Sequence, residues 1–295
     1  MLRTCLLAAL CLSPLASGSA FASASARRAQ GAAGQVSMPD PAALAAQAVQ
    51  NDIKLLTHTG MYLRYRIHKI DDKGDTVRDV IETKEGTVAR MIAKNGRPLT
   101  PQENQAEIDR LNSMLAHPAE FAAHIRRENA EKSHAQNVLQ TIPQGLLFEI
   151  ASPQEPLPGG GSSEVKVVEL TFKPNPDFQP PTIESQVLKS MAGKVWIDTQ
   201  QQQIVHLEVQ LISDAAFGWG LLGKVYRGGS IVIDQMDAGD HHWIMTRLRQ
   251  KLTIRALLVK TLHFDVQEDI TNFSVVKDAL SYQQGIKILL STPAQ

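Results

Sequence analysis

The chain has 295 residues, of which 43% are hydrophobic and 20% are charged. Lys and Arg together number 30, equal to the 30 Asp and Glu, so the formal net charge is zero. That balance disfavours a nucleic-acid partner bound by charge alone, because such a partner needs a strongly basic face.

The start of the chain has the three-part layout of a secretory signal. Positive charge at Met1 and Arg3 precedes an apolar run that begins at Cys5, and small residues recur up to Ala26. A signal peptidase accepts such small residues, so we expect residues 1–26 to be removed. The sequence therefore predicts a periplasmic protein, with secretion from the cell as the alternative.

The mature chain is expected to lack cysteine, because Cys5 and Cys11 both lie in the signal. This excludes disulfides, thiolate metal sites and cysteine nucleophiles. The apolar part of the signal is shorter than the ~20 residues that span a bilayer, and no later segment reaches that length without a charge. We therefore expect no transmembrane segment in the mature chain, while peripheral contact with a membrane stays open.

Composition divides the chain into a few segments. Residues 27–39, rich in Ala, Gly, Gln and Ser, are predicted to form a flexible leader. A single domain is expected over residues 40–280, with a loop insertion rich in Pro and Gly at 151–163 and a C-terminal tail at 281–295.

Local signals predict where helices begin. Asp40 and Pro41 suit the N-cap and the first position of a helix that extends to about residue 56. Thr100 and Glu103 have the spacing of a capping box, in which each side chain bonds to the backbone N–H of the other residue. A second helix is predicted to begin at Pro118 and to end near residue 142.

The remaining pattern is dominated by alternation with period two, the signature of half-buried strands. It is clearest in the C-terminal half, where Val205, Leu207, Val209 and Leu211 alternate with polar residues. Short turns link such segments, which predicts an antiparallel meander with one apolar face. The helices between residues 100 and 142 are the expected cover for that face.

The sequence contains no motif for catalysis, cofactor or metal. It has no Gly-x-Ser-x-Gly, no His-Glu-x-x-His and no glycine loop of the phosphate-binding type. His241 and His242 are predicted to form a solvated turn, because neighbouring strand residues point to opposite faces and cannot easily share one ion. We expect a protein without catalytic residues, cofactor or metal; a secreted hydrolase without a recognisable motif is an alternative.

The segment 215–223 joins two predicted strands, is apolar and carries no charge. One interpretation is a buried loop under the sheet edge, and the other is an exposed lip for an acyl chain or a membrane surface. Trp196 lies between the inward-facing Val195 and Ile197, so it is predicted to face the other side of the sheet. The candidate lipid-binding residues are Phe217, Trp219, Leu221, Leu222 and Trp196.

Two strand patterns resemble those of the outer-membrane lipoprotein-sorting superfamily, the Lol-type periplasmic lipoprotein carriers. The first is the run Gly193-Lys-Val-Trp-Ile-Asp198, followed after a polar turn by Ile204-Val-His-Leu-Glu208. The second is the strand that carries Trp243, followed by strands that end near Asn272 and Phe273. The helix after the signal also fits, and the resemblance would extend over about residues 40–275.

The resemblance implies an α+β, mostly β fold: a curved antiparallel sheet, or incompletely closed barrel, whose concave apolar face is covered by helices and binds acyl chains. No functional residue of the family can be matched to a position in this chain. The resemblance thus implies a non-enzymatic carrier or chaperone for a lipid or lipoprotein acyl chain. The alternative is an envelope structural module with a filled core, which would contact a partner protein through residues 173–181.

Overall fold

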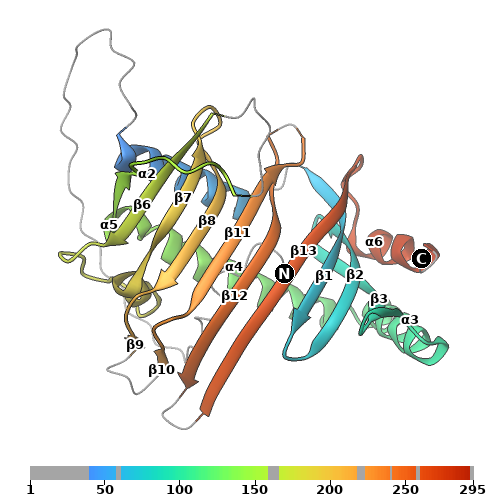
Figure 1. Ribbon diagram of the computed structural model, residues 1–295. Coiled ribbons are helices and arrows are strands. Elements are labelled where there is room, and N and C mark those ends of the chain that lie inside the picture. Colours follow the sequence, from blue (N-terminus) through green and yellow to red (C-terminus); the bar gives the residue numbers. More distant parts are fainter. Residues whose placement is uncertain are drawn as a thin grey trace.

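The computed structural model describes residues 40–57, 61–158, 166–217, 223–239, 241–256 and 260–292. These residues form one large antiparallel sheet with helices packed on it (Figure 1). The predicted signal at 1–26 and the predicted leader at 27–39 lie outside the described residues.

Thirteen strands are paired in the sheet. They are β1 (Tyr62–Asp71), β2 (Gly74–Thr83), β3 (Gly86–Lys94), β4 (Arg97–Pro98), β5 (Leu146–Ile150), β6 (Val167–Pro174), β7 (Met191–Asp198), β8 (Gln203–Leu211), β9 (Ala215–Phe217), β10 (Gly223–Val225), β11 (Ser230–Asp237), β12 (Trp243–Ala256) and β13 (Lys260–Val276). The main order is β4-β3-β2-β1-β13-β12-β11-β8-β7-β6-β5, and β10 pairs with β12 and β9 at its side. In the described part of the chain β4 and β5 stand at the two ends of this path and do not pair with each other, so the sheet is not closed into a barrel. The predicted mostly β, antiparallel class is confirmed.

The last strand joins two meanders into one sheet. Strands β1 to β4 form the first meander, and β5 to β8 with β11 and β12 form the second. Strand β13 inserts beside β1, with Ile270 opposite Ile67. The register shifts between Arg64 and Arg66, where β13 contains one extra residue near Asn272. Asn272 has a φ of 56°, and such a β-bulge bends a strand and redirects its side chains.

The helices are α2 (Pro41–Thr57), α3 (Pro101–Ala116), α4 (Pro118–Leu139), the short α5 (Ile142–Gly145), the 3-10 helix η1 (Glu184–Ser190) and α6 (Tyr282–Ser291). With 22 residues, α4 is about 33 Å long at 1.5 Å per residue. It carries the chain from the β4 end of the sheet to the β5 end and passes behind the strands in Figure 1.

The sheet has an inner face, which α2 covers, and an outer face on the other side. Val209, Ile231 and Leu248 are inner-face residues of the largest buried cluster, and the partly buried Leu207 packs against it. From α2 the same cluster receives Leu44, Ala45, Ala48, Val49 and Ile53. Burial of a Val, Leu or Ile side chain contributes about 1.5–3 kcal/mol, so these apolar contacts dominate the docking of α2 on the sheet.

The capping box that begins α3 is present, since the Thr100 hydroxyl accepts from the Glu103 N–H and the Glu103 carboxylate accepts from the Thr100 N–H. The expectation that α3 covers the inner face is wrong. Leu111 of α3 instead packs in a second cluster with Ile81 and Val88 of the β2–β3 hairpin. Only the end of α4 reaches the inner-face core, which α2 covers, because the middle of α4 is polar and its apolar residues lie at its two ends.

The segment predicted as a C-terminal tail contains a docked helix, α6. Ser281 and Gln284 form a capping box at its start, and Ile286, spaced to share a face with Leu289, is fully buried. Tyr282 stacks on Phe121 of α4 with ring centroids 3.9 Å apart. The capping spacing and the apolar stripe are visible in the sequence, so this helix was predictable.

Candidate functional site

A narrow cavity of about 90 Å³ lies between α2 and the inner face of the sheet. Its walls come from α2, the end of α4, α5, η1 and strands β5, β6, β7, β8 and β11. Asp52 and Gln235 line it, and every other side chain in its lining is apolar. The representative wall residues are Val49, Leu139, Phe172, Val195, Val209 and Ile231.

Period two along neighbouring strands builds the apolar wall. On β7, Val195 stands opposite Leu207 of β8, and Ile197 stands opposite Ile204. Leu207 in turn stands opposite Ile233 of β11. Directly opposed residues have Cβ atoms about 4.5–5.5 Å apart, so these side chains form a continuous hydrocarbon surface beneath α2.

A polar contact closes one end of the cavity. The Gln203 side-chain amide donates to the Asp52 carboxylate of α2, and Gln235 Nε2 lies 3.4 Å from Asp52 Oδ2. One position earlier, Asn51 Nδ2 donates to the Gln202 carbonyl at 2.9 Å. The helix is therefore held to the sheet by hydrogen bonds at this end and by apolar packing along the rest of its buried face.

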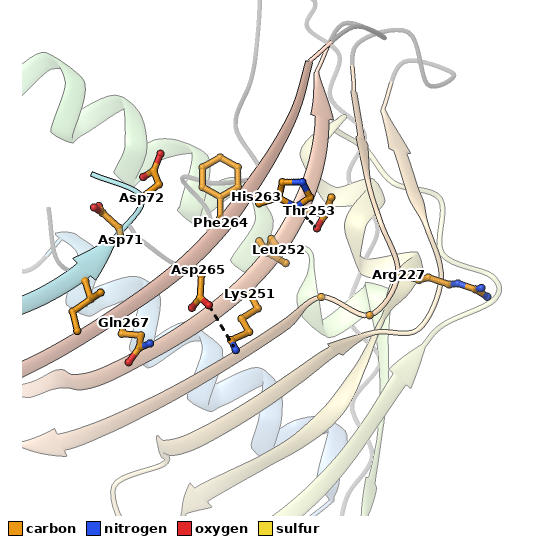
Figure 2. Close-up of a pocket in the computed structure, with 13 residues that line it drawn as sticks. Asp71, Asp72, Arg227, Lys251, Leu252, Thr253, His263, Phe264, Asp265 and Gln267 are labelled. Atoms are coloured by element: carbon orange, nitrogen blue, oxygen red, sulfur yellow. Dashed lines mark hydrogen bonds and ion pairs between the residues drawn. The ribbon is translucent and has the colours of Figure 1, made fainter. Parts of the chain in front are cut away.

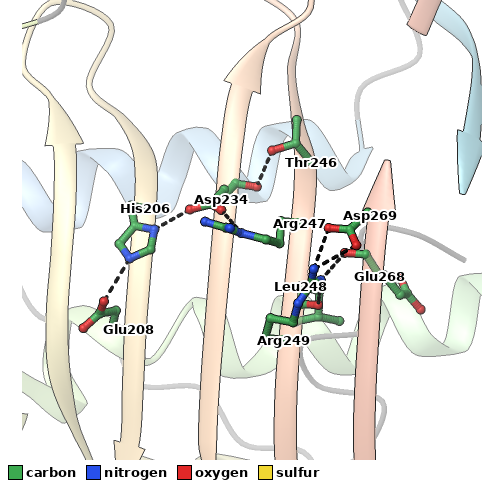
Figure 3. Close-up of polar contacts among 9 residues, drawn as sticks. All are labelled: His206, Glu208, Asp234, Thr246, Arg247, Leu248, Arg249, Glu268 and Asp269. Carbon is green, nitrogen blue, oxygen red and sulfur yellow. Dashed lines mark hydrogen bonds and ion pairs between the residues drawn. The ribbon is translucent and has the colours of Figure 1, made fainter. Parts of the chain in front are cut away.

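Paired charges occupy the outer face behind this wall (Figure 3). His206 is 2% exposed; its Nδ1 bonds to Asp234, and its Nε2 lies 3.2 Å from Glu208 Oε1. Asp234 also accepts from Arg247 Nε. The Trp196 ring meets the His206 ring edge-on, with centroids 4.9 Å apart. The imidazole is thus buried between two carboxylates and an aromatic ring.

Both members of the central pair have shifted pKa values. Burial lowers the pKa of His206, but hydrogen bonds to Asp234 and Glu208 raise it more, so it lies above its usual value. Burial raises the pKa of Asp234, but hydrogen bonds from His206 and Arg247 lower it more, so it lies below its usual value. The arrangement therefore favours the charged form of both groups.

We expect the free energy of unfolding to decrease as the pH rises above about 6.5. A raised histidine pKa gives stability that is fully present below the unfolded-state pKa and is lost as the pH rises through the folded-state pKa. In His206→Gln this part of the pH dependence should disappear, whereas His263→Gln, an exposed control, should retain it. Urea unfolding midpoints across about pH 5–9 test this; equal slopes for the parent and His206→Gln would contradict it.

Trp196 faces the outer side of the sheet, as predicted from its place between two inward residues, and it is 1% exposed. Its indole Nε1 donates to the Glu155 carbonyl at 3.2 Å. Glu155 belongs to the predicted loop insertion, whose described part is fastened to β6: the Ala151 N–H donates to the Glu169 carbonyl. Residues 151–158 thus cover Trp196, and the rest of the insertion lies outside the described residues.

The other candidate lipid-binding residues are only partly described. Phe217 is 7% exposed in β9, stands opposite Gly223 of β10, and belongs to the inner-face core. It does not line the cavity under α2. Trp219, Leu221 and Leu222 lie outside the described residues.

Sequence reasoning missed the contribution of α2 to this site. Ala45, Val49 and Asp52 all line the cavity, and they lie on one face of the helix at spacings of four and three. The apolar stripe of the predicted helix was visible, but a stripe does not specify the surface it covers. Gln203 and Gln235 had no local signal, because they approach Asp52 only in the folded sheet.

A larger concavity of about 530 Å³ lies beside the β1–β2 turn (Figure 2). Lys251 Nζ is 3.6 Å from Asp265 Oδ2 across β12 and β13, and Thr253 Oγ1 is 3.2 Å from His263 Nδ1. Four of its polar side chains thus pair with one another at the surface. The cavity under α2, which is apolar and less open to solvent, is the better candidate for a binding site.

In the described ranges no group of three or more His, Cys, Asp or Glu side chains could hold a metal ion. His241 and His242 were both predicted to lie in a solvated turn. His241 is exposed, as predicted, whereas His242 is buried. No helix in the described part of the chain is both long and apolar enough to cross a membrane.

Known proteins offer a weak structural similarity. No protein-family model and no curated protein matches the sequence. Among solved structures the chain is similar to a DUF1329 family protein from Desulfovibrio piger ATCC 29098, with 9% sequence identity, a TM-score of 0.29, and coverage of 82% of this chain and 95% of that chain. A TM-score this low does not indicate the function of the site, so that function is inferred from the geometry of the site itself.

Proposed function

We propose that the protein is a non-enzymatic periplasmic binding protein, a carrier or chaperone for a lipid or a lipoprotein acyl chain. The observation that supports this is the cavity under α2, whose lining is apolar except for Asp52 and Gln235. A cavity of this composition favours hydrocarbon, because each buried methylene contributes about 0.8 kcal/mol.

Binding of a long acyl chain requires α2 to move away from the sheet. The cavity is narrow, at about 90 Å³, and its opposite wall is a sheet braced by hydrogen bonds on both sides. The helix, by contrast, is held by apolar contacts along its buried face and by hydrogen bonds that include those of Asn51 and Asp52. An entering chain would replace the apolar contacts of α2 with its own, so the exchange costs little hydrophobic free energy.

The apolar segment 215–223 is the proposed entrance for the chain. Phe217, its described member among the candidate residues, packs in the same inner-face core that the cavity borders. Trp219, Leu221 and Leu222 continue this segment in the sequence with apolar side chains and no charge.

Native mass spectrometry of the mature protein purified from its periplasm, with lipid extraction of the same sample, tests the carrier proposal. We expect a reproducible bound species that contains an acyl chain. An empty protein that also fails to take up a fluorescent fatty acid would contradict the proposal. That result would favour the envelope interaction module, for which the narrowness of the cavity is the supporting observation.

A further inference from the structure

We propose that the β-bulge between β1 and β13 forms a binding site for an oxyanion of the phosphate type. A cavity of about 250 Å³ lies there, lined by Arg64, Tyr65, Arg66, Asp79, Asn272 and Ser274. Tyr65 belongs to the inner-face core, so its neighbours Arg64 and Arg66 stand on the outer face. The cavity is therefore separate from the one under α2, and the proposed carrier function does not use it.

The bulge brings donors from both strands to the same space. Arg64 stands directly opposite Ser274, whereas Arg66 stands opposite Thr271, so β13 contains one residue more than β1 between these pairs. Asn272 adopts a left-handed φ of 56° in this extra length of strand. Bulges of this kind redirect side chains and occur often beside functional sites. Here Arg64, Ser274 and Asn272 all line one cavity.

The charges around the cavity leave Arg64 available to a ligand. The Arg66 guanidinium forms a bidentate pair with the Asp79 carboxylate, with Nε 2.7 Å from Oδ1 and Nη2 3.2 Å from Oδ2. Among the described residues, the nearest carboxylate oxygen to Arg64 is Asp79 Oδ2, at 3.9 Å. Its hydrogen bond goes to Thr292 Oγ1 at 3.3 Å. The Arg64 side chain is 34% exposed, so an anion from solvent can reach it.

A third guanidinium, outside the cavity lining, binds the end of the neighbouring helix α6. Arg90 stands opposite Asp79 on β3, and its Nη1 donates to the carbonyls of Leu289 at 2.6 Å and Thr292 at 2.8 Å. These bonds satisfy carbonyl groups at the C-terminal end of α6. The partial negative charge of that helix end would otherwise attract Arg64 in competition with an anion. The cavity lining itself has two guanidinium groups, those of Arg64 and Arg66, against the single carboxylate of Asp79, and this excess of positive charge favours an anionic ligand.

The donor set matches an oxyanion. A guanidinium presents N–H groups in a planar fork that suits the oxygens of phosphate, and hydroxyl and amide donors can bind the remaining oxygens. Two sources share this chemistry: free phosphate, and the phosphate of a lipid head group.

A calorimetric titration of the full mature protein with inorganic phosphate tests the site. We expect saturable binding that weakens at higher salt and that Arg64→Gln weakens by about tenfold or more, the effect of losing a charged hydrogen bond. Arg126→Gln removes the same charge from an exposed position on α4 and should leave binding unchanged. Equal phosphate affinity in the parent and Arg64→Gln, or no saturable binding in the parent, would overturn the proposal.

A second variant keeps the test independent of folding defects. Ser274→Asp places a carboxylate directly across from Arg64, and opposite charges on facing strands stabilise a sheet. Phosphate binding should be lost while the urea unfolding midpoint stays the same or rises. Retained binding in Ser274→Asp would also overturn the proposal.

Co-sedimentation with phosphatidylglycerol vesicles distinguishes the two sources. Vesicle binding that phosphate displaces and Arg64→Gln abolishes supports a lipid head group. Phosphate binding without vesicle binding supports free phosphate. Neither outcome depends on acyl-chain uptake, so this site and the carrier proposal can fail separately.

Discussion

Val209→Phe is expected to abolish the uptake of a fluorescent fatty acid while the protein stays folded. Val209 lies on β8, is 3% exposed and lines the cavity under α2. A phenyl ring at this position would occupy the space into which the chain must enter. Overpacking of this kind typically costs about 1–3 kcal/mol, less than the 5–15 kcal/mol that stabilise a typical domain.

The matched control for Val209→Phe is Val232→Phe. Val232 lies on the neighbouring strand β11 opposite Glu208, and it is half-buried on the outer face. The substitution adds the same ring to the same sheet without entering the cavity, so fatty-acid uptake should match that of the parent. Fluorescence titration of the three proteins, with circular dichroism to verify folding, measures both effects. If Val209→Phe takes up the probe as the parent does, the cavity under α2 is not the acyl site.

Local patterns predicted the elements of this fold because they depend on neighbouring residues. The alternation in residues 205–211 placed Leu207, Val209 and Leu211 on the inner face, where Val209 and Leu211 are buried and Leu207 is partly buried. It misplaced Val205, because the register shifts between Trp196 and Ile197. Val205 therefore packs with Trp196 in a cluster apart from the inner-face core. A bulge depends on how two strands pair, and one strand's sequence does not record it.

Pairings over long sequence distances could not be predicted. The stripe on α2 and the capping box of α3 both predicted helices, yet neither states which helix covers the inner face. His206 and Asp234 meet across two strands, and Arg64 meets Ser274 only after β13 returns beside β1. Both the cavity under α2 and the oxyanion site are made by such pairings, so their residues carry no local motif.

Gly193→Ala is expected to cause a large loss of stability. A Cβ at Gly193 would lie 1.9 Å from the Glu208 carbonyl oxygen and 2.8 Å from Phe172 Cζ. The first contact is with backbone, so β7 and β8 would have to separate. An ordinary Gly→Ala change in a strand gains about 0.5–1 kcal/mol; here we expect a net loss of about 3 kcal/mol or more, as for severe overpacking. Urea unfolding measures the difference.

The control for this prediction is Gly223→Ala. Gly223 is also a strand glycine, but its nearest atom would be the Arg255 carbonyl oxygen at 3.3 Å, so the unfolding midpoint should stay within a small range of the parent's. Equal effects of the two substitutions would show that the stability of the fold does not depend on the close approach of the backbone at Gly193.

Gly193 also explains how Phe172 becomes part of the cavity wall. Phe172 of β6 stands opposite Gly193, and its ring covers the position that a side chain would fill. An alanine there would push the ring towards α2, because the ring lines the cavity on that side. Gly193→Ala should therefore reduce fatty-acid uptake even at low temperature without denaturant, where the variant is still folded. If the folded variant takes up the fatty acid as the parent does, Gly193 does not determine the shape of the cavity, and its effect is on the stability of the sheet alone.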